Sequence, residues 1–133
     1  MAKIAIIGSR GYTNSRKVKD FIFNLKQKLG DELEIVSGGA KEGADKYAKR
    51  FALDFDIKYS EFPAYHEPHN IHCVEGSFKY NKPYSPGNYH RRNHDLVKYS
   101  DKVVAFCKGE VTNGTLSALK SAKKLNKKSI IID

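Results

Sequence analysis

Three glycine-bearing turns constrain the fold of this chain, because each one follows a short apolar run. The apolar runs are residues 3–7, 34–37 and 101–107, and the turns are residues 8–10, 37–45 and 109–115. Short apolar runs of this kind are typical of buried strands in a parallel sheet. In an open α/β sheet the carboxyl ends of the strands line the ligand crevice. We therefore expect the three turns to meet at one edge of a sheet and to form an anion-binding crevice there.

The remaining pattern alternates strands with helices along the whole chain. The predicted strands are residues 3–7, 34–37, 57–62, 101–107 and 129–132, and the predicted helices begin near residues 15, 42, 91 and 114. Apolar residues recur at helical spacing in these helices, for example Leu116, Leu119, Ala122 and Leu125 in the last one. With right-handed crossovers, this order predicts a single Rossmann-like α/β domain over residues 1–133, with three layers, a five-stranded mainly parallel sheet and helices on both faces.

Residues 64–89 interrupt the pattern and have no clear period. They contain three of the four prolines (Pro68, Pro83 and Pro86) and four tyrosines (Tyr65, Tyr80, Tyr84 and Tyr89). A loop of this length in a compact domain is usually functional or mobile. We interpret it as a lid or an insertion, with a short hairpin as one option, and its tyrosines are candidates for stacking on a base.

Composition limits the partners of the chain more weakly. The net charge is +9, from 24 Lys and Arg against 15 Asp and Glu, which suits anionic ligands or a polyanionic partner. Many of the basic residues fall at solvent-facing helical positions, so a solvated basic surface is favoured over a nucleic-acid stripe. No apolar run is long enough to cross a bilayer, and the start is too short for a signal peptide. Cys73 and Cys107 show no paired spacing, so we expect a reduced, cytoplasmic setting and no membrane partner.

Five motifs in order give the chain a resemblance to a known family. They are Ile7-Gly8-Ser9-Arg10, Ser37-Gly38-Gly39-Ala40 with Gly43-Ala44-Asp45, Arg92-Asn93 with Leu96-Val97, Ser100 to Phe106, and Gly114-Thr115. The series resembles the small Rossmann-like proteins of the SLOG superfamily, which joins the DNA-processing protein A (Smf) group to the "lonely guy" phosphoribohydrolases. It is most similar to the stand-alone YspA-like branch, common in bacteria and phages. The resemblance covers nearly the whole chain except residues 64–89.

The resemblance implies a nucleotide-derived ligand across the strand ends. Some relatives bind NAD-derived signals such as cyclic ADP-ribose species, others cleave a base from a nucleoside monophosphate, and the DNA-processing branch binds single-stranded DNA. Relatives often form dimers or tetramers through their helices, so the resemblance also implies a homo-oligomer. No separate cofactor is required by this interpretation; the nucleotide itself is the expected ligand.

The candidate ligand-binding residues lie in or beside the three turns. They are Gly8, Ser9, Arg10, Gly38, Gly39, Ala40, Gly43, Asp45, Arg92, Asn93, Gly114 and Thr115. Arg10 is a candidate to bind phosphate with its planar guanidinium, and the resemblance places Arg92 and Asn93 facing the ligand. Gly43 has a second explanation, close helix–strand packing. Asp45 either accepts a ribose hydroxyl or complements the helix dipole, and Glu42 has the same two explanations, with capping favoured.

All five histidines lie between positions 66 and 94. His66, His69 and His72 are spaced by three, with Cys73 adjacent, whereas His90 and His94 are four apart. A transition-metal site is one interpretation, but the spacings match no standard zinc module. We favour stacking or hydrogen-bonding imidazoles and predict no metal.

The third turn separates a binding protein from a hydrolase. The hydrolase relatives carry a glutamate three residues after the Gly-Thr pair, where this chain has Ala118, and the preceding residues Glu110, Val111 and Thr112 depart from their Pro-Gly-Gly pattern. Removal of a base needs an acid or base within reach, and alanine supplies neither. We therefore expect a protein that senses or sequesters a nucleotide-like ligand. The alternatives are an N-glycosidase that uses Asp45, Glu42 or Glu75, and a single-stranded nucleic-acid-binding module.

Overall fold

The computed structural model describes residues 1–109 and 111–133, and Glu110 lies outside the described residues. The strands are β1 (Ala2–Gly8), β2 (Leu33–Ser37), β3 (Lys58–Glu61), β4 (Lys102–Phe106) and β5 (Lys128–Ile132). The helices are α1 (Ser15–Leu29), α2 (Ala44–Asp54), α3 (Gly87–Tyr99) and α4 (Asn113–Lys124), with 3₁₀ turns η1 (Gly30–Glu32) and η2 (Ser77–Lys79). The sequence predicted each of these strands and α-helices to within a few residues.

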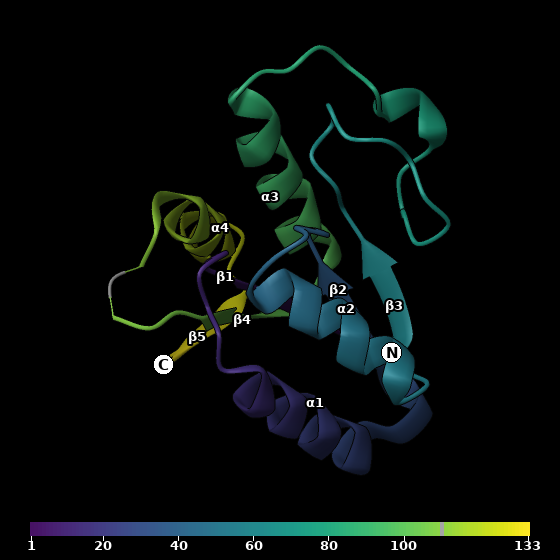
Figure 1. Ribbon diagram of the computed structural model, residues 1–133, viewed down its shortest axis with the longest axis vertical. Coiled ribbons are helices and arrows are strands. Elements are labelled where there is room, and N and C mark those ends of the chain that lie inside the picture. The colour runs from purple at the N-terminus through teal and green to yellow at the C-terminus, as the bar shows by residue number, and fades with distance from the viewer. Residues whose placement is uncertain (110) are drawn as a thin grey trace.

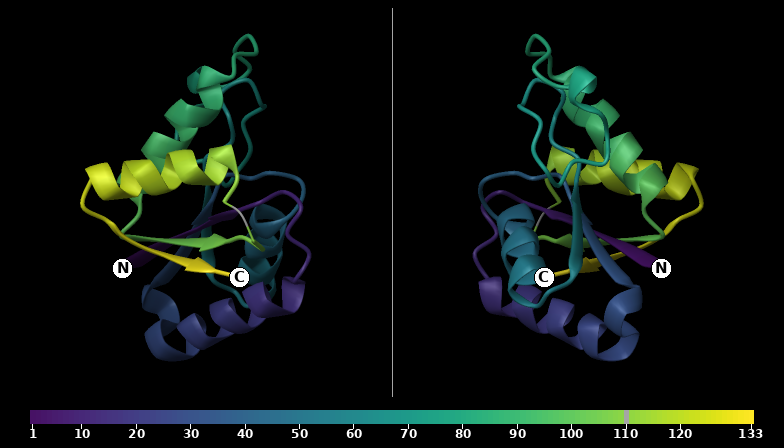
Figure 2. Two further views of the ribbon diagram at one scale, coloured as in Figure 1. Left: turned by 90° about the vertical axis from the view of Figure 1, so that its left-hand side faces the viewer. Right: turned by 90° about the vertical axis from the view of Figure 1, so that its right-hand side faces the viewer.

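The five strands form one sheet in the order β3-β2-β1-β4-β5, and every pairing is parallel. This confirms the predicted α/β class. Figures 1 and 2 show α1 below the sheet and α4 above it, so the sheet is the middle of three layers. From β1 the chain adds β2 and β3 on one side of the sheet and then β4 and β5 on the other side, so the strand order reverses between β1 and β4. An open α/β sheet has its ligand crevice at such a switch point.

Alternate residues of β1 support the two halves of the core. Ile4 and Ile6 pack with α1 and α2 residues such as Ile22 and Ala48 on one face. Ala5 and Ile7 pack on the other face, with Leu96 of α3 and Ala118 of α4 in the same cluster. This alternation follows from the two-residue period of a strand whose two faces are both covered.

Helix boundaries follow local signals, with two departures from the expectations. Asn14 caps α1 by accepting a hydrogen bond from the Lys17 amide at 3.2 Å. α3 begins at Gly87, four residues before the expected start, because Pro86 is compatible with a helical first turn that needs no amide donor. Leu116 was expected to face inward, but it is 40% exposed; the buried face of α4 consists of Thr115, Ala118 and Ala122.

The segment between β3 and α3, residues 62–86, is ordered by contacts with the edge of the sheet. The Glu61 amide donates to His72 O at 2.9 Å, and the Val74 amide donates to Glu61 O at 3.3 Å. The predicted hairpin option was wrong, since this fully described segment contains no strand and only the η2 turn. Figure 1 shows the segment rising beyond the carboxyl end of β3, beside α3.

Candidate functional site

The carboxyl ends of β1, β2 and β4 open into a crevice of about 650 Å³. Most of the predicted ligand-binding residues line it: Gly8, Ser9, Arg10, Gly38, Ala40, Asp45, Arg92, Asn93, Gly114 and Thr115. Residues of α3, together with Tyr84 and Pro86 just before it, also line the crevice. The fold therefore brings together residues from all three turns, as the sequence predicted, whereas Gly39 and Gly43 lie outside this crevice.

Arg92 is anchored by the main chain at the floor of the crevice. Its Nη1 donates to Gly38 O at 2.6 Å and to Phe62 O at 3.1 Å, and its Nε donates to the Asn93 side chain at 2.9 Å. Asn93 in turn donates to Gly114 O at 3.2 Å. This chain of hydrogen bonds links α3 to both the second and the third turn. Burial lowers the pKa of the Arg92 guanidinium, although the nearby Asp45 opposes the effect.

Asp45 is buried at the start of α2, and its Oδ2 accepts a hydrogen bond from the Ala40 amide at 3.1 Å. A Cβ atom added to Gly38 would lie 2.5 Å from Arg92 Nη1 and 3.0 Å from Asp45 Oδ2, so both charged atoms occupy space that a side chain at Gly38 would need. Burial raises the pKa of Asp45, while Arg92 and the Ala40 amide act against this rise. The carboxyl group is therefore closer to titration at neutral pH than an exposed aspartate.

Two of the turn glycines, Gly39 and Gly43, have structural explanations, and only that of Gly43 was left open by the sequence. The Gly39 amide donates to Ser37 Oγ at 3.2 Å, so that it is used within the protein. A Cβ atom at Gly43 would lie 2.2 Å from Ser9 O, which shows that the start of α2 packs directly on the first turn. Close packing, the alternative explanation for Gly43, accounts for this contact.

The third turn presents a helix start to the crevice. Within the described residues, no side chain caps the first amides of α4, and Thr112 Oγ1 donates instead to Thr115 Oγ1 at 3.1 Å. Gly114 has open space where a Cβ atom would be. Uncapped amides at a helix start favour an anion, since the helix dipole adds to their partial positive charge. Ala118 lines the same wall and contributes no acid.

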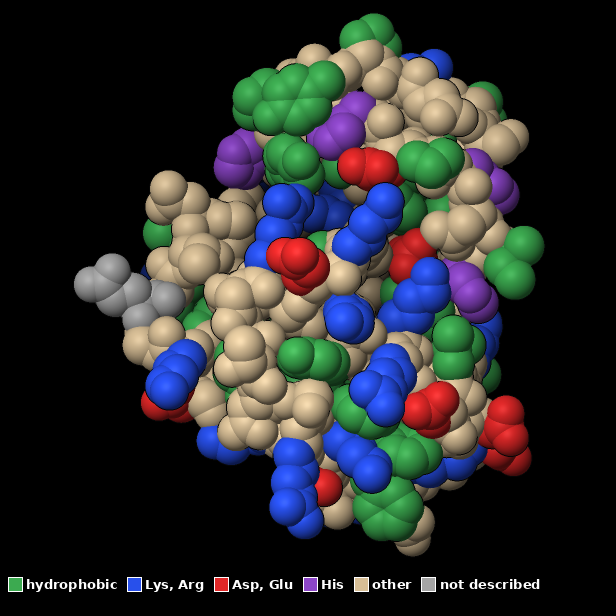
Figure 3. All heavy atoms as spheres, viewed as in Figure 1, with side chains coloured by type: hydrophobic (Ala, Val, Ile, Leu, Met, Phe, Trp, Pro, Cys, Tyr) green, Lys and Arg blue, Asp and Glu red, His purple; other side chains and the backbone are tan. Residues whose placement is uncertain are grey.

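Arg10 also lines the crevice and is exposed. Its Cζ is 5.7 Å from the centroid of the Tyr89 ring, and the Cζ of Arg92 is 5.8 Å from the same centroid. Neither arginine takes part in an ion pair within 4.0 Å in the described part of the chain. Figure 3 shows Lys and Arg side chains gathered across the middle of this face, with acidic side chains among them.

Only some of the insertion's aromatic residues reach the crevice. Tyr84 and Tyr89 line it, but Tyr65 and Tyr80 are buried inside the insertion with their rings 5.6 Å apart. These two tyrosines are therefore not available to stack on a ligand in this structure. Burial raises the pKa of Tyr65, which donates to Asp95 of α3. The contact joins the insertion to α3.

The histidines lie among aromatic and polar partners. The His66 ring lies 4.9 Å from the Tyr84 ring and 5.0 Å from the Tyr89 ring, and His72 lies 5.3 Å from Tyr59. His69 contacts Tyr80, and His90 Nδ1 lies 2.8 Å from Ser117 Oγ. Across residues 1–109 and 111–133, no three His, Cys, Asp or Glu side chains are grouped as a metal site would require. His94 lines a separate surface groove.

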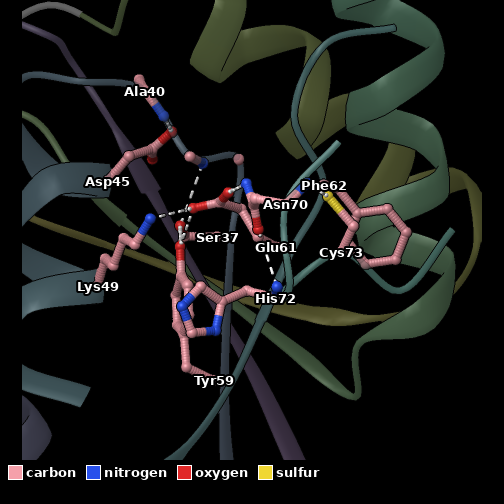
Figure 4. Close-up of polar contacts among 12 residues, drawn as sticks. Ser37, Ala40, Asp45, Lys49, Tyr59, Glu61, Phe62, Asn70, His72 and Cys73 are labelled. Atoms are coloured by element: carbon pink, nitrogen blue, oxygen red, sulfur yellow. Dashed lines mark hydrogen bonds and ion pairs between the residues drawn. The ribbon is translucent and has the colours of Figure 1, made fainter. Parts of the chain in front are cut away.

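Sequence reasoning missed a buried polar network beside the crevice, centred on Glu61 (Figure 4). The Tyr59 hydroxyl donates to Glu61 Oε1 at 2.7 Å and lies 2.7 Å from Ser37 Oγ, and Asn70 donates to Glu61 Oε2. Lys49 Nζ is 3.4 Å from Glu61 Oε1. Burial, followed by the charge of Glu61, raises the pKa of Tyr59. A carboxylate at the carboxyl end of a predicted strand was the available signal.

The other acidic candidates lie away from the crevice. Glu42 is exposed and lines a neighbouring hollow, and Glu75 forms an ion pair with Lys79 at 3.2 Å within the insertion. Of the three carboxylates considered for hydrolysis, only Asp45 lines the crevice. No described helix has the length and apolar character needed to cross a membrane.

Comparisons with known proteins give relatives by structure alone. No family model matches the sequence, and no curated protein matches it. A DNA processing protein A from Helicobacter pylori, studied for single-stranded DNA binding, is similar with a TM-score of 0.69 and 24% identity over 99% of this chain and 65% of that protein. The chain thus spans slightly less than two thirds of that structure.

Two molybdenum cofactor proteins have a similar fold. The molybdenum cofactor binding protein of Rippkaea orientalis has a TM-score of 0.69 and 23% identity over 98% of this chain and 75% of that one. The molybdenum cofactor carrier protein of Chlamydomonas reinhardtii has a TM-score of 0.62 and 19% identity over the same shares. The chain therefore shares the Rossmann-like α/β fold of DNA processing protein A and of the molybdenum cofactor proteins, and at these identities the likeness shows the fold alone.

Proposed function

We propose that the protein binds a small phosphorylated ligand of the nucleotide type in the crevice at the carboxyl ends of β1, β2 and β4. The observation that carries this proposal is the convergence of Arg10, Arg92 and the uncapped start of α4 on one crevice. Each of these favours an anion, and Arg92 has its charge held in place by carbonyl groups that do not neutralise it.

The walls around this positive floor suit a nucleoside. Tyr84 and Tyr89 offer aromatic surface, Asn93 and Thr115 offer polar groups, and Ile7 and Leu96 offer apolar contacts. Single-stranded DNA and the molybdenum cofactor, which the structural relatives bind, both combine phosphate with a ring system. The ligand we have in mind is an NAD- or ADP-ribose-type molecule or a cyclic nucleotide, bound for sensing or sequestration, as the family resemblance implies. The same resemblance leads us to expect a homo-oligomer.

A thermal-shift and calorimetric panel of nucleotides, cyclic nucleotides and ADP-ribose tests the proposal. A ligand that binds should raise the melting temperature of the wild type. Arg10→Ala should weaken its binding by roughly 10- to 100-fold, because a charge-assisted hydrogen bond contributes about 1.5–3 kcal/mol. Arg16→Ala is the matched control, since Arg16 is also exposed but lies outside the crevice. Equal affinities of the two variants, or no stabilising ligand, would count against the crevice.

Asp45 supports a second candidate function, an N-glycosidase that acts on a nucleoside monophosphate or an NAD-like substrate. It is a buried carboxyl with a raised pKa in the crevice, and such groups are frequent among catalytic acids. The test is release of free base from the panel nucleotides, with Asp45→Asn as the inactive variant and Glu42→Gln as its comparison. A short oligonucleotide in the same panel examines the nucleic-acid alternative, which predicts affinity that falls steeply with salt.

A further inference from the structure

A second hollow of about 420 Å³ adjoins the crevice on the side of β3 and the insertion. Five residues line both spaces: Arg10, Gly38, Ala40, Tyr89 and Arg92. The Tyr89 ring lies close to both guanidinium groups, at 5.7 and 5.8 Å. The two spaces are therefore neighbours across these side chains, which we call the Arg–Tyr–Arg partition (Arg10, Tyr89 and Arg92).

The two spaces differ in chemistry. Among the described residues that line the crevice, Asp45 is the one acidic residue and Arg10 and Arg92 carry the positive charge, while the remaining lining residues are mainly apolar or neutral. The second hollow is lined by two lysines and three glutamates, Lys41, Lys49, Glu42, Glu61 and Glu67, and by Asn70. Such a set offers both donors and acceptors at short range.

One polar side chain of the second hollow, the buried Glu61, is held in place by its neighbours. Glu61 is 2% exposed and is fixed by Tyr59, Asn70 and Lys49, as Figure 4 shows. A fixed carboxylate with neighbouring ammonium and amide groups suits hydroxyl groups, which donate to the carboxylate and accept from the other two. A purely apolar group would leave these partners without hydrogen bonds from the ligand.

We infer that the ligand spans both spaces: a nucleoside lies in the crevice, a diphosphate lies at the Arg–Tyr–Arg partition, and a hydroxyl-rich group such as a sugar lies in the second hollow. The class is thus a nucleoside diphosphate joined to a sugar, rather than a mononucleotide. Two guanidinium groups at the shared wall match the charge of a bridging diphosphate. This inference rests on the proposed function and extends it to a second subsite.

The experiment compares each nucleoside diphosphate with its sugar conjugate by calorimetry: ADP with ADP-glucose, GDP with GDP-mannose, and UDP with UDP-glucose. For the base that fits the crevice, the conjugate should bind at least 10-fold tighter than the parent diphosphate. Asn70→Ala and Lys49→Gln should each remove most of this gain and leave the affinity for the parent unchanged. Gly114→Leu, which adds a side chain at the crevice, should weaken parent and conjugate equally.

The outcomes separate the two proposals. Binding of a parent diphosphate without tighter binding of its conjugate, or a gain that survives in both second-hollow variants, overturns the two-subsite inference and leaves the crevice proposal standing. Absence of binding by every diphosphate and every conjugate overturns the two-subsite inference, and absence of binding across the nucleotide panel as well overturns both proposals. Because Asn70 contacts buried Glu61, the melting temperature of Asn70→Ala is measured first, and Lys49→Gln gives an independent result at a half-buried side chain.

Discussion

At the scale of single residues, the crevice depends on Gly38 having no side chain. Gly38 leaves room for Arg92 Nη1 and Asp45 Oδ2 on the same side of the backbone, each within 3.0 Å of the point where a Cβ atom would lie. The two opposite charges interact through space without a direct ion pair within 4.0 Å. Ionisation of Asp45 consequently remains unfavourable, because burial removes the hydration of the carboxylate and the attraction of Arg92 offsets only part of that cost.

Asp45→Asn should make the protein more stable at neutral pH. The folded state raises the pKa of Asp45 above 3.8, so its ionised form opposes folding, and the stability that the protonated form contributes is lost as pH rises through the folded pKa. Asparagine keeps an acceptor for the Ala40 amide. We expect a melting temperature higher by a few degrees at pH 7, at roughly 3–5 °C for each 1 kcal/mol in a domain of this size.

Scanning calorimetry at pH 7 and pH 4 checks this expectation. The advantage of Asp45→Asn over the wild type should shrink toward pH 4, where more of the wild-type carboxyl is protonated. Asp20→Asn, an exposed change on α1, is the control and should show no such trend. A destabilised Asp45→Asn protein at pH 7 would contradict the assignment of burial as the dominant effect.

At the scale of elements, the start of α2 and the first turn are fitted to one another. Gly43 has φ +74° and ψ −147°, and the amide of the next residue, Ala44, donates to Ser9 O at 3.4 Å. A side chain at Gly43 would collide with that carbonyl oxygen. The crevice floor therefore depends on two elements that approach each other more closely than side chains allow.

Gly43→Ala should destabilise the protein far more than Gly30→Ala. Gly30 has a similar backbone conformation, φ +55° and ψ −130°, but nothing lies within 4 Å of its virtual Cβ atom. Gly30→Ala thus measures the conformational cost alone, about 1–3 kcal/mol, and Gly43→Ala adds the collision with Ser9 O. Urea unfolding of both variants gives the difference; equal free energies of unfolding would show that the first turn moves aside without cost.

Elements are also the scale at which the sequence was most informative. Short apolar runs identified the three central strands β1, β2 and β4, because strands covered on both faces have few polar positions. The exposure of Leu116 could not be seen, since the pattern ranks leucine above alanine whereas α4 packs closely through Ala118 and Ala122. The start of α3 was misplaced because proline and glycine are typical of both loops and helix starts.

The candidate site was predictable in position but less so in its details. The three turns and Arg10 were predicted because the carboxyl ends of the strands mark the crevice. Arg92 and Asn93 were predicted only through the family resemblance. Glu61 could have been noticed at its strand end, but its network could not, because Ser37 and Asn70 come from segments other than β3, which carries Tyr59 and Glu61. Contacts between distant segments leave no spacing signal in one sequence.

At the scale of the whole molecule, a third buried carboxylate, after Asp45 and Glu61, ties α3 to the sheet at the end opposite the crevice. Glu34 of β2 is fully buried, and its Oε2 accepts hydrogen bonds from Ser60 Oγ at 2.7 Å and Tyr99 Oη at 2.6 Å. Lys58 Nζ lies 3.2 Å from Oε1. Burial alone raises the pKa of Glu34, but the hydrogen bonds from Tyr99, Ser60 and Lys58 outweigh it, and the net effect lowers the pKa.

Stability in acid should depend on Glu34. Its folded pKa lies below the ordinary value of 4.5, so the stability it contributes is present above pH 4.5 and is lost as pH falls through the folded pKa. Between pH 7 and pH 3 the wild type should lose more melting temperature than Glu34→Gln, by several degrees. Glu32→Gln, an exposed neighbour in η1, is the control. Parallel losses in wild type and Glu34→Gln would assign acid sensitivity to other groups.

The anchoring of Arg92 also bears on how the protein tolerates mutation. Its hydrogen bonds go to the carbonyl groups of Gly38 and Phe62, and every residue type supplies a carbonyl. A substitution at Phe62 can therefore change packing without deleting the partner of the arginine. The position of this positive charge therefore tolerates a change of side chain at Phe62, whereas Gly38 must remain without a side chain to leave room for the arginine.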